Sequence, residues 1–298
     1  MALLEACAVL VDASGPDPRQ VKANYAAFHE AKDGITTLSA SGTLLPTSEG
    51  AHQLVGLPAS TVFPFLRQSA RSAFPAVTAE DLIPSVRFRV SSGRHSCDAH
   101  FKGAFTIASS LAAQQHLLNS SHEWCAGRLL APGASGNASY PPAVHASLAV
   151  LEVQGQLPQG AEATWSNREH AEEPLRQGQQ VWACGTPFGS MSPRHFQSCW
   201  VGGHIANAVH DKDGSTGLHL LDLYSLPGME GGPIADSSGA LVGLLGPVLS
   251  HTTFQAQVST LIPAASVLLS LRQWLQQTAA SKLQRASLSM QLCDFATD

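Results

Sequence analysis

Charged side chains are scarce in this sequence. Only 13% of its 298 residues are charged, with 17 Lys and Arg against 22 Asp and Glu, and the formal net charge is -5. Proteins that bind nucleic acid through its phosphates present a basic surface, so this class is not indicated. Because 44% of the residues are hydrophobic, the composition supports a folded core and argues against a disordered chain. The length allows two domains or one large all-β unit.

Long apolar runs and targeting features are also missing. No apolar run approaches the length of a membrane span. The first residues, Met1 to Cys7, carry no basic residue ahead of their apolar ones, so we expect no secretory signal. The final residues, Phe295 to Asp298, are not a peroxisomal address. Ser281-Lys282-Leu283 spells such an address, but it is read only at the end of a chain.

Cysteine and histidine show no ligand spacing. The six cysteines contain no C-x-x-C pair, which speaks against a zinc knuckle or a redox motif. We expect free thiols in a reducing compartment. No two of the 13 histidines stand four apart beside an acidic residue on a credible helix. We therefore expect neither a metal nor a cofactor. The cysteines are Cys7, Cys97, Cys125, Cys184, Cys199 and Cys293.

What the sequence does contain is many short apolar segments separated by Gly, Pro, Ser and Asp turns. Such segments predict strands, and those of the first half are Ile35–Leu45 with a break at Ser41-Gly42, Gln53–Leu57, Val86–Val90 and Ser147–Val153. Those of the second half are Gln179–Gly185, Trp200–Ala208, Leu218–Leu223, Ala240–Leu245 and Phe254–Ile262. Leu3–Asp12 is predicted to be either a first strand or a short helix. Helical spacing is weak over Ile107–Leu118.

A last helix is predicted over Pro263–Gln277. Its apolar stripe consists of Val267, Leu268, Leu271, Trp274 and Leu275. Strands in this rhythm followed by one helix indicate an all-β fold of two antiparallel barrels, with a mixed α+β domain as the alternative. We place the first barrel, with loop insertions, in residues 1–160 and the second with its helix in 170–280. Residues 281–298 would form a tail.

The stretch Leu226-Pro227-Gly228-Met229-Glu230-Gly231-Gly232-Pro233-Ile234 organises the second half. Four further motifs surround it in order. They are Gly185-Thr186-Pro187-Phe188-Gly189, Val201-Gly202-Gly203-His204-Ile205, Asp222 and Gly239-Ala240-Leu241-Val242-Gly243. From Gly178 to Ala264 this order resembles the Deg/HtrA branch of the trypsin-like proteases. More narrowly, Cys184 to Phe188 with Leu226 to Gly232 resembles the family of peroxisomal leader-peptide-processing proteases and their plant glyoxysomal relatives.

The resemblance implies two Greek-key barrels of the trypsin-like type and a catalytic triad at three known positions. The nucleophile loop of the family reads G-[DN]-S-G-G-P, so Glu230 stands where the family has its Ser, and Gly228, Met229 and Glu230 form the oxyanion-hole loop. Ser147 opens the strand that begins with Asp in the family. The base position falls at Pro58, with His52 as the only nearby imidazole and the fallback base. All three positions are thus altered, and we expect no intact catalytic residue.

Three functions follow from the resemblance. In this family an N-terminal protease-like half carries a similar P-G-x-E-G-G loop, and a separate C-terminal half holds the intact triad. The chain would then be a non-catalytic half that works in peroxisomes and packs against a catalytic half or a homologous subunit. The first alternative is a stand-alone pseudoprotease that holds peptide segments between its barrels. The second is an active peptidase whose nucleophile is elsewhere, for example Cys199 with His195. Neither a nucleic acid nor a membrane partner is expected.

Overall fold

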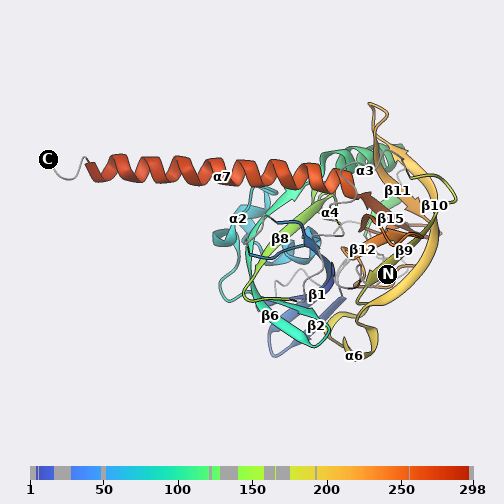
Figure 1. Ribbon diagram of the computed structural model, residues 1–298, viewed down its shortest axis with the longest axis horizontal. Coiled ribbons are helices and arrows are strands. Elements are labelled where there is room, and N and C mark those ends of the chain that lie inside the picture. Colours follow the sequence, from blue (N-terminus) through green and yellow to red (C-terminus); the bar gives the residue numbers. More distant parts are fainter. Residues whose placement is uncertain are drawn as a thin grey trace.

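The fold consists of two closed barrels of six antiparallel strands and a long C-terminal helix (Figure 1). A computed structural model describes residues 5, 7–16, 28–47, 52–120, 123–127, 140–157, 165, 175–191, 193–254 and 256–294. Along these residues no helix combines the length and the apolar character needed to cross a membrane. The predicted two barrels with a terminal helix are confirmed, and the alternative of a mixed α+β domain is wrong.

The first barrel is built from six strands of the N-terminal half. They are β1 (Ala8–Pro16), β3 (Ile35–Leu45), β4 (Leu54–Pro58), β5 (Arg87–Ser92), β6 (His95–Thr106) and β8 (Ser147–Val153). Around the barrel their order is β1-β3-β4-β8-β6-β5, and pairing of β5 with β1 closes the ring. A further strand, β2 (Phe28–Lys32), forms a hairpin with β3.

The second barrel repeats this plan. Its strands are β9 (Gln180–Gly185), β10 (Cys199–His210), β11 (Thr216–Leu221), β12 (Pro233–Asp236), β13 (Leu241–Leu245) and β15 (Gln257–Pro263). Their order around the ring is β9-β10-β11-β15-β13-β12, which is the first barrel's order strand for strand. Two short strands, β14 (Leu249–His251) and β7 (Trp124–Ala126), extend this sheet beyond β15.

The strand patterns explain where each core lies. Alternate residues of β1, among them Val9 and Val11, point into the first barrel, as the two-residue period of a strand requires. In β8 both faces are apolar, because Leu151 fills the first barrel while Leu148 and Val150 pack between the two barrels. The second barrel has its own core around residues such as Ile234. The two barrels are therefore joined by a continuous apolar layer.

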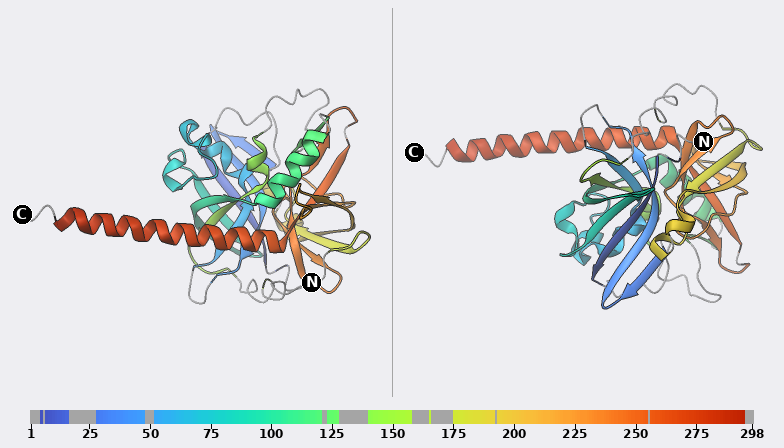
Figure 2. Two further views of the ribbon diagram at one scale, coloured as in Figure 1. Left: turned by 90° about the horizontal axis from the view of Figure 1, so that it is seen from above. Right: turned by 60° about the horizontal axis from the view of Figure 1, so that its bottom comes forward.

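Two long helices lie against this layer. In the first of them, α3 (Ala108–Ser120), the buried Ser110 hydroxyl donates to the Gly217 carbonyl of β11 at 2.8 Å. The terminal helix α7 (Ala264–Asp294) buries Val267, Leu268 and Leu271 near its start and then projects beyond both barrels (Figures 1 and 2). The short helices are η1 (Ala59–Thr61), η2 (Phe63–Phe65), α2 (Gln68–Arg71), η3 (Ala79–Asp81), α4 (Pro142–His145), η4 (Gly189–Met191) and α6 (Pro193–Phe196).

Several expectations need correction. The strand β3 runs without a break through Ser41-Gly42. The helix α7 continues to Asp294, so residues 281–294 extend it instead of belonging to a separate tail, and residues 295–298 lie outside the described part of the chain. Leu275 of the expected stripe is 39% exposed. The strand β7 pairs with the second barrel's sheet although it lies within residues 1–160. The strand β6 was not predicted, because polar residues on its outward face hide the alternation.

Candidate functional site

The loop between β11 and β12 lies where the two barrels meet. Gly228 and Gly231 have φ angles of +92° and +87°, a left-handed conformation that glycine adopts without steric cost. A Cβ atom at Gly231 would lie 2.4 Å from Cδ of Pro58 and 2.5 Å from the carbonyl oxygen of Ser41. This position therefore requires glycine for two reasons. Its φ angle is positive, and the first barrel leaves no room for a Cβ atom.

Two hydroxyl groups of β3 hold this loop against the first barrel. The backbone N–H and the hydroxyl of Ser41 both donate to the Gly228 carbonyl, at 2.7 and 2.8 Å. The same hydroxyl accepts the Thr186 N–H at 2.8 Å. Further along β3, the Thr43 hydroxyl donates to the Gly231 carbonyl at 2.8 Å. Ser41 thus connects the loop to the Gly-Thr-Pro-Phe-Gly turn of the second barrel.

Glu230 is buried at the centre of the loop, with 1% of its surface exposed. Its Oε2 atom accepts the Gly228 N–H at 3.2 Å. In an oxyanion-hole loop such N–H groups stabilise the negative charge that develops on a substrate carbonyl. Here the N–H group of Gly228 is already bound by the protein's own carboxylate.

The three residues at the positions equivalent to the triad, Pro58, Ser147 and Glu230, line one small cavity between the barrels. The cavity has a volume of about 10 Å³, room for about one water molecule. Pro58 is the last residue of β4 and pairs with Leu148 in β8, which brings it beside Ser147. Glu230 reaches the cavity from the opposite barrel. Its lining is Pro58, Ser60, His145, Ser147, Leu148, Glu230, Gly231, Leu245, Gly246, Pro247 and Ile262.

The Ser147 hydroxyl is engaged in local structure. It donates to the Ala143 carbonyl at 2.6 Å and lies 2.7 Å from the Thr106 hydroxyl. These contacts join the start of β8 to α4 and to the end of β6. A hydroxyl held in this way carries no charge with which to stabilise an imidazolium ion.

His52, the fallback base, lies at the other end of β4 from Pro58. Its side chain is 75% exposed, and Nε2 is 3.9 Å from Oε1 of Glu152, whose second oxygen binds Lys102 at 2.7 Å. His52 is not among the residues that line the cavity. The structure does not bring this imidazole to Glu230.

His145 is the imidazole that lines the cavity, and sequence reasoning did not single it out. It is buried, and neither ring nitrogen has a hydrogen-bond partner in the described part of the chain. Burial lowers the pKa of His145 to about 4. An imidazole with so low a pKa is a weak base near neutral pH. The available signal was its place two residues before Ser147, but its sequence neighbours form no catalytic motif.

Cys199, the nucleophile that the sequence suggested as an alternative, is not an activated thiol. Burial raises the pKa of the Cys199 thiol, whereas an activated thiol needs a lowered one. Its suggested partner His195 is exposed on α6. The described cysteines are all free thiols: Cys7, Cys97, Cys125, Cys184 and Cys199. No group of three His, Cys, Asp or Glu side chains suited to a metal ion occurs within the described ranges.

Comparison with known proteins gives one family and one curated relative. The trypsin-like peptidase domain matches residues 98–244, from β6 to β13. The mouse peroxisomal leader peptide-processing protease is 34% identical over 115 residues, which are 38% of this chain and 18% of that protein. The matched region thus spans less than a fifth of the relative's length.

Solved structures of similar fold cover most of the chain at low identity. The active form of the Rv3671c protease from M. tuberculosis is 16% identical, with a TM-score of 0.48 over 91% of this chain and 82% of that one. The HtrA-type protease AlgW with a decapeptide is 13% identical, with a TM-score of 0.47 over 91% of this chain and 66% of that one.

Proposed function

We propose that this chain, which belongs to the trypsin-like peptidase family, is a protease-like unit without catalytic activity that supports a separate catalytic half. The observation that carries the proposal is the buried Glu230 carboxylate in the oxyanion-hole loop, where it accepts the Gly228 N–H. Acyl transfer needs a nucleophile that loses its proton as it attacks. The Glu230 side chain thus occupies an N–H group that would otherwise stabilise the substrate's oxyanion.

The other two triad positions support the same conclusion. Proline at position 58 has no group that takes up a proton, and the Ser147 hydroxyl is used by Ala143 and Thr106. His145 lines the same cavity, but burial lowers its pKa. Neither of its ring nitrogens has a hydrogen-bond partner among the described residues, so no carboxylate orients the imidazole as in a triad. These losses are chemically independent, so restoring one residue leaves the others missing.

The relative suggests the role of such a unit. That protein is named as a protease that processes leader peptides in peroxisomes, and the match covers 18% of it. In our proposal the present unit packs against a catalytic half, or a homologous subunit, of a protein of this kind and shapes its assembly or specificity. Whether the unit binds the catalytic half is tested by mixing the two and measuring the mass of the product by size-exclusion chromatography with light scattering. A stable complex with the corresponding catalytic half is expected, and two separate peaks at micromolar concentration would contradict it.

We propose that the unit acts in the peroxisome, because the relative is named as a peroxisomal protease. The Ser281-Lys282-Leu283 sequence lies inside α7. In our proposal the catalytic half brings this unit into the organelle. The test is fluorescence microscopy of the tagged chain with and without the catalytic half, and a diffuse signal in both cases would refute the location.

The absence of catalysis is tested by restoring the hydroxyl. We expect the wild-type chain and Glu230→Ser to show neither fluorophosphonate labelling of a serine nor peptide cleavage above the background rate. A residual oxyanion hole without a triad accelerates hydrolysis only about 10³–10⁴-fold over water, far below a working protease. Glu230→Ala is the matched control, because it removes the carboxylate without adding a hydroxyl.

Two results would overturn this prediction. Stoichiometric labelling of the wild type at one serine would show that the nucleophile lies elsewhere in the chain. Efficient cleavage by Glu230→Ser but not by Glu230→Ala would show that a working base is present, and His145 at the cavity would be the first residue to replace.

A further inference from the structure

The strand β7 leaves its own barrel and adds to the edge of the other one. It follows α3 in the connection between β6 and β8, yet it pairs antiparallel with β14, with Ser250 opposite Cys125. Two flanking bonds extend the ladder: the Gly127 N–H donates to the Val248 carbonyl at 2.7 Å, and the Thr252 N–H donates to the Glu123 carbonyl at 2.8 Å. Residues 123–127 therefore occupy this edge as an added strand.

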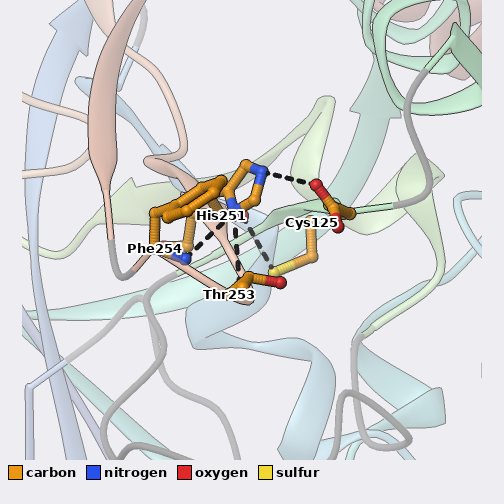
Figure 3. Close-up of polar contacts among 6 residues, drawn as sticks. Cys125, His251, Thr253 and Phe254 are labelled. Carbon is orange, nitrogen blue, oxygen red and sulfur yellow. Dashed lines mark hydrogen bonds and ion pairs between the residues drawn. The ribbon is translucent and has the colours of Figure 1, made fainter.

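A side-chain clamp fixes the beginning of this added strand (Figure 3). Nδ1 of His251 accepts the N–H groups of Thr253 and Phe254, both at 3.2 Å, so its proton is on Nε2. Nε2 lies 3.0 Å from a carboxylate oxygen of Glu123, and the ring is buried. The Trp124 ring meets the imidazole edge-on, with centroids 5.1 Å apart. The buried imidazole thus faces an acidic residue of the added strand.

Cys125, Glu123 and His251 lie close together but form no catalytic triad. The Cys125 thiol donates to the Ser250 carbonyl at 3.4 Å, and burial raises its pKa. Both nitrogens of His251 are used by Glu123 and by the backbone. The cluster therefore binds the strand and has no free base.

The added strand leads toward the candidate site. It runs antiparallel to β14, so its C-terminal end points to Gly246 and Pro247, which line the cavity with Glu230. At this end a Cβ atom on Gly127 would lie 3.3 Å from Cε1 of His145, another cavity residue, and the φ angle of Gly127 is +99°. The edge of β14 and the cavity are thus adjacent parts of one surface.

We propose that the edge of β14 is a binding site for an extended peptide of a partner protein, and that β7 is its internal occupant. The inference rests on the proposed non-catalytic function, because the segment is held and not cut. The occupant defines the chemistry of the ligand. It has a carboxylate for His251, then an aromatic residue, a small residue at the place of the buried Ala126, and a glycine where the chain passes His145.

Exchange is physically accessible because β7 lies at the end of its sheet. It is the last strand in the order of the described sheet, where it pairs with β14. Edge strands with few partners open at lower free energy than strands inside a barrel. A partner peptide that makes the same backbone bonds would compete with β7 for the same edge.

The test uses a fluorescent peptide with the sequence of residues 121–128, in which serine replaces the residue corresponding to Cys125. In one variant Cys125 and Gly127 are both changed to proline, because the alternating ladder makes these the residues whose N–H groups face β14, and proline cannot donate. We expect this variant to bind the peptide at least ten-fold more tightly than the wild type, as measured by fluorescence anisotropy. Replacing the peptide's Glu with Gln should weaken binding about ten-fold.

A second variant keeps the test decisive if the proline variant fails to fold. Ser250→Cys places a thiol opposite Cys125, and oxidation should lock β7 in place. The reduced form should bind the peptide and the oxidised form should not. Equal titrations of the two redox forms, or of a folded proline variant and the wild type, would overturn the proposal. Mass spectrometry of the peptide after each titration separates the two proposals, since cleavage would refute the non-catalytic function while the affinities still report on the edge.

Discussion

The two barrels share one strand order but use their connections differently. If the strands of each barrel are counted one to six along the chain, both barrels have the order 1-2-3-6-5-4. In the second barrel the connection between strands three and four is the short loop 222–232, which contains Glu230. In the first barrel the equivalent connection is 28 residues long, 59–86. The connection between strands five and six carries β14 in the second barrel and α3, β7 and α4 in the first.

Equivalent connections of the two barrels meet each other. The cavity is lined by residues from both three-to-four connections, such as Ser60 and Glu230, and from both five-to-six connections, such as His145 and Pro247. The strands β7 and β14, which pair antiparallel, come from the two five-to-six connections. The repeated topology thus brings equivalent connections of the two barrels together at the cavity. The residues and short elements within these connections determine the chemistry of the site.

The largest effect is expected where a loop of the second barrel touches the first. Gly231→Ala should lower the free energy of unfolding by on the order of 3 kcal/mol, because it adds backbone strain and a Cβ atom 2.4 Å from Pro58. Gly214→Ala is the matched control in the β10–β11 hairpin, where φ is +79° and no atom lies within 4 Å of the new Cβ. It should cost only about 1 kcal/mol. Urea unfolding measures both, and equal losses would show that the barrels do not constrain the loop.

The second barrel was easier to predict than the first for a physical reason. Its turns need glycine at fixed places, such as Gly228 and Gly231 with their positive φ angles, and these leave a readable pattern in the sequence. The first barrel is specified mainly by alternation, which fails where an outer face carries mixed polar residues, as in β6. The family match begins at Asp98, inside that strand.

The site could be predicted only in part. The stretch around Glu230 was visible because its glycines and proline stand in a fixed order. Pro58 followed from counting along the expected hairpin, and Ser147 from the resemblance of its strand to the one that begins with Asp in the family. His145 and the clamp of His251 were missed, because each depends on residues far apart in the chain. Ser41 was taken for a strand break, since a Ser-Gly pair suggests one, whereas its hydroxyl serves the opposite barrel.

An effect of similar size is expected from acid, through the imidazole at the cavity. Burial lowers the pKa of His145 to about 4, whereas an unfolded histidine titrates near 6.5. The unfolded state therefore takes up this proton first, and the stability that His145 contributes above pH 6.5 is lost as the pH falls toward 4. The full loss is about 3 kcal/mol.

Denaturant unfolding between pH 7 and pH 4 measures this loss in the wild type and in His145→Gln. The variant should lose less stability over the range by about the amount given above. His52→Gln, at a side chain 75% exposed, is the control and should follow the wild type. A His145→Gln profile parallel to the wild type would show that the imidazole is hydrated in the folded protein.

The smallest effect is expected from the hydroxyl that links the two barrels. Ser41→Ala removes the bond to the Gly228 carbonyl and leaves the buried Thr186 N–H without its acceptor. The Gly228 carbonyl keeps the Ser41 N–H, so the loss should be about 2 kcal/mol, most of it from the unsatisfied amide. Ser14→Ala is the control, because the Ser14 hydroxyl bonds Thr37 within the first barrel, and this variant should cost about 1 kcal/mol or less.

Hydrogen exchange separates a link between the barrels from a local bond. In Ser41→Ala the Thr186 amide of the second barrel should exchange faster relative to the β9 amides. In Ser14→Ala its exchange should not change. Unchanged protection of Thr186 in Ser41→Ala would mean that the loop is held by the second barrel without help from the first.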